Sequence, residues 1–286
     1  MSVILLRTTQ ELRAWRLTQK ESVGFVPTMG NLHQGHLSLL EASLREHPVS
    51  VLSIFVNPTQ FGPNDDFARY PRTLEADKTL VEGLAAGYPE RTIAIFAPAS
   101  SAEIYPAGFG SLIRVPALDG FLEGAFRPGH FDGVATVVYL LFSLVKPRTA
   151  YFGRKDYQQY RVIKRMARDL ELPVHVKGLS IIRDQFGLAL SSRNQYLSAE
   201  QKDAALILYR TLAEAKKRLA GEARRSEDVR RYLAECVRRD KNWQYLELRE
   251  ARTLSEAIPG KGKVVLLGVY LMGGVRLLDN LESEIA

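Results

Sequence analysis

The spacing of hydrophobic residues divides the first 180 residues into alternating short and longer segments. Short apolar runs with β-branched residues are typical of buried parallel strands, and apolar residues every three or four positions are typical of helices. The predicted strands are residues 3–6, 22–26, 49–56, 92–96, 149–152 and 174–181. The predicted helices are residues 9–20, 36–46, 73–86, 131–146 and 156–170. This alternation predicts an α/β fold, a Rossmann-like parallel sheet with flanking helices.

The pattern changes after about residue 183. A long helix is predicted over residues 198–219, opened by a Ser198/Gln201 capping box, and a second helix over residues 226–239. The predicted strands that follow are residues 245–250, 264–272 and 275–278. Gly-Gly between the last two is a hairpin turn signal. These elements predict a smaller α+β C-terminal domain.

Composition limits the class of protein. The 286 residues are 46% hydrophobic and 25% charged, as in ordinary globular proteins. A net charge of +7 is compatible with nucleic-acid binding or with a pocket for small anions. The basic residues of segments 216–218 and 224–239 are mixed with acidic ones, which favours a solvated helix face and predicts no nucleic-acid partner.

Cysteine count and apolar runs predict the compartment. Cys236 is the only cysteine, so neither an intrachain disulfide nor a cysteine-based zinc site is possible. The apolar run at residues 3–6 is too short for a signal peptide, and residues 137–145 are too few to span a membrane. We therefore expect a cytoplasmic protein without a membrane partner.

Residues 24–36 form the most informative stretch. A buried strand, a loop with two glycines and an amphipathic helix follow one another here. Helix N-termini bind phosphates through unpaired N–H groups, and glycines let a ligand approach the backbone. His33 and His36 add donors at the same place. A single histidine is usually structural, but two at this junction predict a nucleotide-triphosphate site. Zinc is disfavoured, since no third ligand is nearby.

Two further stretches lie where predicted strands end. In residues 55–62, Asn57 and Gln60 would suit a small hydroxy acid, with a plain Asn-Pro turn as an equal alternative. In residues 151–159, Lys155 would hold phosphates and Asp156 would cap a helix or hold a metal-bound phosphate. Gln159 lies one helical turn after Asp156. The alternative is a capped helix with solvated basic side chains.

A fourth stretch, residues 190–194, contains two serines and an arginine near the expected domain junction. Hydroxyl and guanidinium groups bind phosphate oxygens well. A polar linker is the alternative, and it would be preferred if this stretch stood by itself.

The four stretches, with Arg-Pro-Gly-His-Phe-Asp-Gly-Val at residues 127–134, resemble the pantoate–β-alanine ligase family. His-Gln-Gly-His at residues 33–36 is similar to the His-x-Gly-His element of the wider nucleotidylyl-transferase superfamily. The resemblance implies ATP-dependent ligation of (R)-pantoate and β-alanine through pantoyl adenylate, with release of AMP and pyrophosphate. It also implies a Mg²⁺ requirement and a homodimer. Residues 1–183 would form the ATP- and pantoate-binding domain, and residues 184–286 a C-terminal lid domain.

The resemblance also implies roles for individual residues. His33, His36, Lys155 and Arg193 would be catalytic, with His36 as the proton donor, and Asp156 would meet the metal. Gln60 and Gln159 would hold pantoate, with Gln60 also near β-alanine, and Asn57 would lie beside them as part of the substrate-binding group. The ATP-binding residues would be Met29, Gly30, Asn31, Leu32, His33, Gln34, Gly35, His36, Gly153, Arg154, Lys155, Asp156, Ile182, Leu190, Ser191, Ser192 and Arg193. Arg127 and His130 match a motif of the family without an assigned role.

Two other function classes compete with this one. A nucleotidylyltransferase that forms a dinucleotide from ATP and a phosphate acceptor would share the histidine loop. Its phosphate acceptor would require cationic side chains, whereas Asn57, Gln60 and Gln159 are neutral amides. A nucleic-acid binder would require a continuous basic face with interleaved aromatic residues, and the sequence does not show one.

Overall fold

The structure is a computed structural model that describes residues 2–63, 65–219, 225–256 and 262–285. The chain divides into two compact units. The first consists of Met1–Arg154 and Val162–Ser180, and the second of Lys155–Arg161 and Ile181–Ala286. The expected division of labour between an ATP- and pantoate-binding domain and a lid domain stays a prediction.

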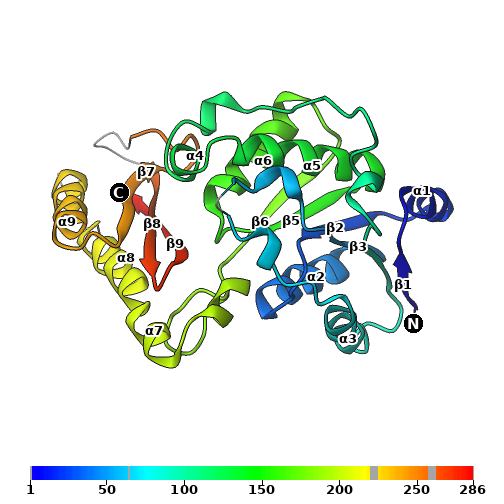
Figure 1. Ribbon diagram of the computed structural model, residues 1–286, viewed down its shortest axis with the longest axis horizontal. Helices are drawn as coiled ribbons and strands as arrows, with labels where there is room; N and C mark the ends of the chain where they lie inside the picture. Colours follow the sequence, from blue (N-terminus) through cyan, green and yellow to red (C-terminus); the bar gives the residue numbers. More distant parts are fainter. Residues whose placement is uncertain (1, 64, 220–224, 257–261, 286) are drawn as a thin grey trace. The chain divides into compact units, whose positions relative to one another are not determined.

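The first unit is built on a six-stranded parallel sheet (Figure 1). Its strands are β1 (Ser2–Leu6), β2 (Val23–Thr28), β3 (Val49–Ile54), β4 (Thr92–Phe96), β5 (Thr149–Gly153) and β6 (His175–Leu179). Their order in the sheet is β1-β4-β3-β2-β5-β6. The predicted α/β class and parallel sheet are confirmed.

This strand order has a switch point. From β2 the chain builds outward through β3 and β4, and it then returns to add β5 and β6 on the other side of β2. Adjacent loops after β2 and β5 therefore lead in opposite directions. In open α/β sheets a ligand binds at the carboxyl ends of the strands beside such a point.

Helices cover both faces of the sheet. The helices of this part of the chain are α1 (Thr9–Thr18), α2 (Gln34–Glu46), α3 (Leu74–Ala85), the short α4 (Glu123–Phe126), α5 (His130–Val145) and α6 (Tyr157–Asp169), whose first residues belong to the second unit. Val26 and Leu52 pack with α2 and α3 on one face. Phe25 points to the other face, where its ring meets Phe142 of α5 edge-on at 6.2 Å. Figure 1 shows α5 on one side of the sheet and α2 and α3 on the other.

The second unit packs helices on an antiparallel sheet of order β7-β8-β9. Its elements are η5 (Ser192–Tyr196), α7 (Ala199–Ala204), α8 (Leu206–Leu219), α9 (Arg225–Arg239), β7 (Trp243–Glu250), β8 (Gly262–Met272) and β9 (Val275–Ile285). Gly273 and Gly274 both have positive φ, so they form the predicted two-residue hairpin between β8 and β9.

Most predicted elements differ from the structure by one or two residues at their ends, and two differ more. The single long helix after residue 198 is two helices, α7 and α8, separated at Ala205. There the N–H of Leu208 bonds to the carbonyl oxygen of Ala205, three residues back instead of four, which tightens the turn. Strand β9 is also longer than predicted, because pairing with β8 continues to Ile285 although its last residues are partly polar.

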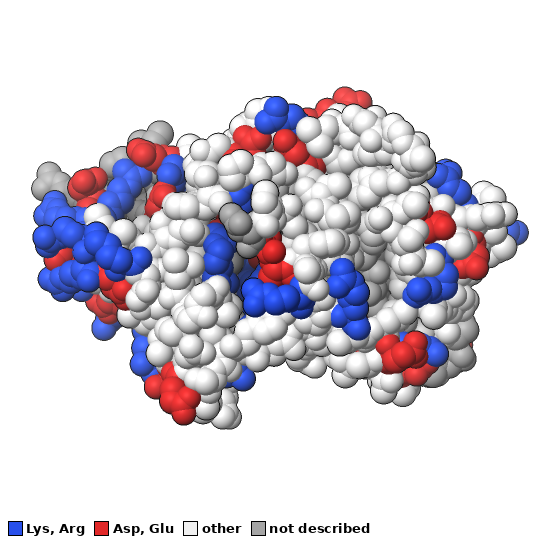
Figure 2. Space-filling view, viewed as in Figure 1, with Lys and Arg blue, Asp and Glu red and all other residues white. Residues whose placement is uncertain are grey.

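Charge and hydropathy on the surface follow the sequence pattern. Figure 2 shows basic side chains gathered over α8 and α9, with acidic side chains among them. Arg238 and Arg239 both pair with Glu235 at 2.6 Å, and Arg218 pairs with Glu214 at 2.9 Å. Among the described residues, no helix combines the length and the apolar character needed to cross a membrane.

A buried histidine in the first unit makes stability depend on pH. His47 follows α2, is 4% exposed, and bonds through Nδ1 to the hydroxyl of Ser22 at 3.1 Å. Burial lowers the pKa of His47. The charge of Glu46 raises this pKa, and the charges of Arg148 and Lys177 lower it further. The folded state therefore binds this proton less readily than the unfolded chain does.

We expect the free energy of unfolding to decrease as the pH falls below about 6.5, the unfolded pKa of histidine. His47→Asn keeps a partner for the Ser22 hydroxyl but does not titrate, so its loss of stability between pH 7.5 and 5.5 should be smaller. Urea unfolding at several pH values measures the free energy of unfolding of the wild type and of His47→Asn. Equal pH slopes for the two proteins would contradict the prediction.

Candidate active site

The turn from β2 into α2 carries the two histidines. His33 is the N-cap residue of α2, and its Nδ1 accepts the N–H of Gly35 at 3.1 Å. Nδ1 of His36 accepts the N–H of His33 at 3.4 Å, and the ring centroids lie 4.2 Å apart. Because both Nδ1 atoms accept hydrogen bonds, each neutral ring carries its proton on Nε2.

This capping changes how the helix end meets an anion. The N–H of Gly35 already donates to His33, and the N–H of His36 donates to the carbonyl oxygen of His33 at 2.8 Å. Two backbone N–H groups of this turn are therefore already engaged within it, and each imidazole adds an Nε2–H group. The helix dipole still favours negative charge here.

A buried carboxylate anchors the loop before the histidines. Asp77 of α3 is 1% exposed. Its Oδ2 accepts the N–H of Asn31 at 3.0 Å and its Oδ1 accepts the N–H of Leu32 at 2.7 Å. The hydroxyl of Thr73 donates to Oδ2 at 3.2 Å. Two backbone donors of the loop are thus fixed to one rigid helix.

Gln60 extends the site from the next strand. It ends the 3₁₀ turn η1 (Pro58–Gln60), and its Nε2 lies 3.2 Å from the sulfur of Met29. Its Oε1 accepts the amide Nδ2 of Asn57 at 3.1 Å. The structure thus brings the side chains of Gln60 and Met29 together.

Asn57 itself is 1% exposed. Its Nδ2 also donates to the carbonyl oxygen of Gly133 at 3.2 Å, and its Oδ1 accepts the hydroxyl groups of Tyr105 at 2.8 Å and Thr59 at 3.0 Å. Burial raises the pKa of Tyr105, which keeps its hydroxyl protonated. Contacts of fixed polarity therefore surround Asn57, and they orient the Gln60 amide with Nε2 away from Asn57.

Helix α5 approaches η1 closely beside Asn57. A Cβ atom on Gly133 would lie 2.3 Å from the carbonyl oxygen of Thr59. Glycine is therefore required at this position for η1 to pack against α5.

Gly153 and Arg154 lie at the end of β5, the strand beside β2. The N–H of Arg154 donates to the carbonyl oxygen of Leu179 at 2.9 Å, and its guanidinium donates to the hydroxyl of Ser180 at 3.1 Å. These contacts tie Arg154 to the end of β6.

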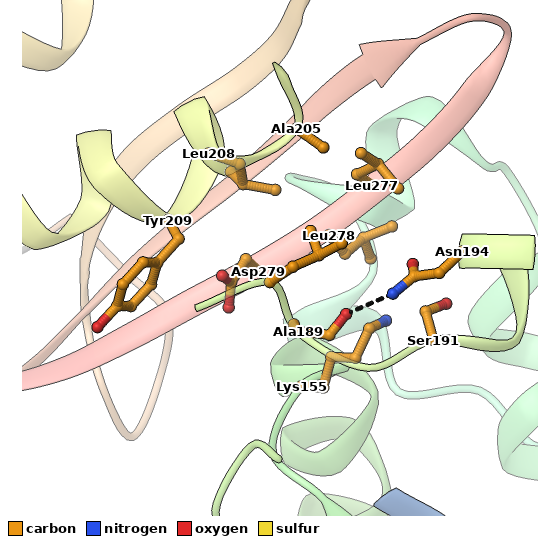
Figure 3. Close-up of a pocket in the computed structure, with 11 residues that line it drawn as sticks. Lys155, Ala189, Ser191, Asn194, Ala205, Leu208, Tyr209, Leu277, Leu278 and Asp279 are labelled. Atoms are coloured by element: carbon orange, nitrogen blue, oxygen red, sulfur yellow. Dashed lines mark hydrogen bonds between the residues drawn. The ribbon is translucent and has the colours of Figure 1, made fainter. Parts of the chain in front are cut away.

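The second unit holds the other predicted residues. Lys155 Nζ lies 3.6 Å from Asp156 Oδ1, and the Asp156 side chain is 48% exposed. Lys155 and Ser191 line a pocket with apolar side chains of α8 and β9 (Figure 3). The amide of Asn194 donates to the carbonyl oxygen of Ala189 at 3.0 Å beside it.

The segment from Ile182 to Leu190 closes on itself, since the N–H of Leu190 donates to the carbonyl oxygen of Ile182 at 3.0 Å. Ser191 is the N-cap of η5, which contains Ser192 and Arg193. Gln159 is partly buried in α6. The predicted phosphate loop is thus an ordered 3₁₀ turn.

Strand β9 supports this group through residues that sequence analysis missed. Asn280 donates to the carbonyl oxygen of Lys155 at 2.8 Å. Asp279 accepts two bonds from Arg183, at 2.6 and 2.8 Å, and the guanidinium stacks 4.5 Å from the ring of Tyr209. Lys155 and the segment that starts at Ile182 are therefore both attached to the same strand.

Comparison with known proteins agrees with this geometry. Residues 4–282 match the family model of pantoate-beta-alanine ligase. The chain belongs to this family. The pantothenate synthetase of Dehalococcoides mccartyi is 48% identical over 261 residues, which cover 91% of this chain and 95% of that protein.

Solved structures of the family extend over the same length. The pantothenate synthetase of Thermus thermophilus has a TM-score of 0.88 and 43% identity, and it covers 98% of this chain and 99% of its own. The pantoate-beta-alanine ligase of Francisella tularensis, solved with beta-gamma ATP and β-alanine, has a TM-score of 0.74 and 30% identity over 98% and 97% of the two chains. The chain is therefore an ATP-dependent enzyme that ligates pantoate to β-alanine. The comparisons do not favour a dinucleotide-forming nucleotidylyltransferase.

Asp77 is the residue of the first unit that sequence analysis most clearly missed. The available signal was its spacing, because Asp77 shares the buried face of α3 with Val81 and Ala85, at intervals of four. An acidic residue on a buried face needs partners, and here they are backbone N–H groups of the loop between β2 and α2.

Asp77→Asn replaces one acceptor oxygen with a donor that faces a loop N–H. We expect the KM for ATP to rise about 10-fold or more, since a buried backbone donor loses its partner. Thr73→Val, which removes only the hydroxyl bond to the same carboxylate, is the matched control and should have a smaller effect. Steady-state kinetics measures the KM for ATP of both variants. An unchanged KM for Asp77→Asn would contradict the prediction that Asp77 holds the loop in place for ATP.

Proposed function

We propose that this ligase activates (R)-pantoate as pantoyl adenylate before β-alanine reacts. The carboxylate of pantoate attacks the α-phosphorus of ATP and pyrophosphate leaves. The amine of β-alanine then attacks the acyl carbon, and AMP leaves as the amide bond forms. The contact of 3.2 Å between Gln60 Nε2 and Met29 supports the adenylate, because it puts an amide that could bind the pantoate carboxylate beside the loop proposed to bind ATP.

In the first unit the proposal assigns the phosphates to His33 and His36. Their Nε2–H groups would donate to phosphate oxygens as charge builds on the leaving pyrophosphate. His36 would also be the proton donor of the reaction, as the family resemblance implies. The other ATP-binding residues of this unit would be those from Met29 to Gly35, with Gly153 and Arg154.

Gln60 would bind pantoate directly through Nε2. Asn57, with its amide hydrogens and Oδ1 already engaged, would act on pantoate through Gln60. The burial of Asn57 supports the indirect role.

In the second unit the proposal assigns Lys155 and Arg193 to phosphate charge, Gln159 to pantoate, and Ile182, Leu190, Ser191 and Ser192 to ATP. The support is chemical. Lys155 and Ser191 line one pocket, and Asn280 and the Ser191 cap fix their backbones.

Mg²⁺ would be held by Asp156 together with phosphate oxygens. Among the described residues there is no cluster of three or more acidic, histidine or cysteine side chains that would hold a metal by itself. One half-exposed carboxylate fits Mg²⁺, which proteins commonly bind through one or two carboxylates plus substrate phosphates. When bound, the ion would neutralise charge on the departing pyrophosphate.

The proposal includes a homodimer in the cytoplasm. Phe109, Leu112 and Phe126 expose large apolar side chains within the region from residue 98 to 128, which supports part of an interface there. The single cysteine, Cys236, fits a reducing compartment.

The order of steps has a direct test. If pantoyl adenylate forms first, the enzyme should exchange labelled pyrophosphate into ATP when pantoate is present and β-alanine is absent. Chelation of Mg²⁺ should stop the exchange. Exchange that requires β-alanine would contradict the adenylate, whereas exchange that persists in chelator would contradict only the metal assignment.

His36→Ala should lower turnover about 10²–10³-fold, the effect of removing one donor to a developing charge. His36→Gln places an amide N–H near the position of the imidazole Nε2 and should retain more activity than His36→Ala. Single-turnover measurements of AMP formation compare the variants. A rate equal to that of the wild type in His36→Ala would remove His36 from the mechanism.

A further inference from the structure

The family motif at residues 127–134 has a structural target, the backbone of Gln60. His130 is 8% exposed, and its Nδ1 lies 2.8 Å from the carbonyl oxygen of Gln60. The guanidinium Nη2 of Arg127 donates to the same oxygen at 3.3 Å. Two side chains from a distant part of the chain thus hold one carbonyl group.

These contacts fix the tautomer of His130. A carbonyl oxygen only accepts, so Nδ1 of His130 carries the proton. Nη1 of Arg127 only donates, and it lies 3.2 Å from Nε2 of His130, so Nε2 accepts. One neutral tautomer satisfies both neighbours.

Arg127 is itself held in place. Its Nη2 donates to Asp65 at 2.8 Å, and this guanidinium is only 17% exposed. Burial opposes ionisation of Asp65, but the bonds from Arg127 and from the N–H of Gly62 outweigh it and lower the pKa of Asp65. The acidic partner therefore stays charged.

We propose that Arg127 and His130 are positioning residues for pantoate, which fix the main chain at Gln60 so that its Nε2 stays beside Met29. This inference rests on the proposed role of Gln60. Asn57 orients the side-chain amide, and Arg127 with His130 fixes the main chain that carries it. Both are needed because a rotation of η1 would move Nε2 even with its bond to Asn57 intact.

Two substitutions of His130 separate the contacts. His130→Asn places an amide nitrogen near the position of Nδ1, so it keeps the bond to Gln60. His130→Gln reaches the position of Nε2, so it keeps the contact with Arg127 and loses the bond to Gln60. Thermal unfolding of both variants identifies any general loss of stability.

We expect His130→Gln to raise the KM for pantoate about 10-fold, the effect of one lost hydrogen bond, with the KM for ATP changed less than about 2-fold. His130→Asn should stay within about 3-fold of the wild type. Arg127→Lys, which keeps the charge but not the fork between Asp65, Gln60 and His130, should resemble His130→Gln.

Gln60→Ala provides the second half of the test. It should raise the KM for pantoate strongly, and adding His130→Gln should then have little further effect, because no amide remains to be positioned. If Gln60→Ala acts and His130→Gln alone does not, or if the two effects multiply in full, the inference is overturned while the role of Gln60 stands. If Gln60→Ala leaves the KM for pantoate unchanged, the proposed role of Gln60 fails and this inference fails with it.

Discussion

Two hydrogen bonds, from the N–H groups of Asn31 and Leu32 to the buried Asp77 carboxylate, fix the loop that leads to the histidine turn of the candidate site. They join the loop after β2 to a helix that packs on the sheet, so the loop has little freedom of its own. His33 can then cap α2, and the capping box orients both imidazoles. The donors of this turn are thereby set before any ligand arrives, which is the condition for electrostatic preorganisation.

The same principle applies to Gln60. Its side-chain oxygen, its main-chain carbonyl and the segment after it each have a separate partner, namely Asn57, His130 and Asp65. Fixed donors and acceptors around the amide distinguish its oxygen from its nitrogen. In the proposed function, a neutral amide held in this way would bind the pantoate carboxylate without the cations that a phosphate acceptor would require.

Local pattern was sufficient for most of the fold. Strand β4 has the predicted bounds, and the Gly-Gly hairpin lies where the sequence indicated. The failures have a common cause. The break at Ala205 comes from a change in the backbone hydrogen-bond pattern and the extension of β9 to Ile285 from pairing with β8, neither of which hydrophobic spacing encodes.

The sequence by itself determined the succession of strands and helices along the chain and the position of the histidine turn. It also showed the resemblance to a family of ligases. Only the tertiary structure decided that both Nδ1 atoms of His33 and His36 accept hydrogen bonds, that Asn57 is buried, and that Asp77 bonds to the loop after β2 and His130 to the backbone of Gln60. The reason is distance along the chain. Asp77 lies 46 residues from Asn31, and His130 lies 70 residues from Gln60. Hydrogen bonds over such separations exist only after the sheet has brought α3 and α5 to its carboxyl edge.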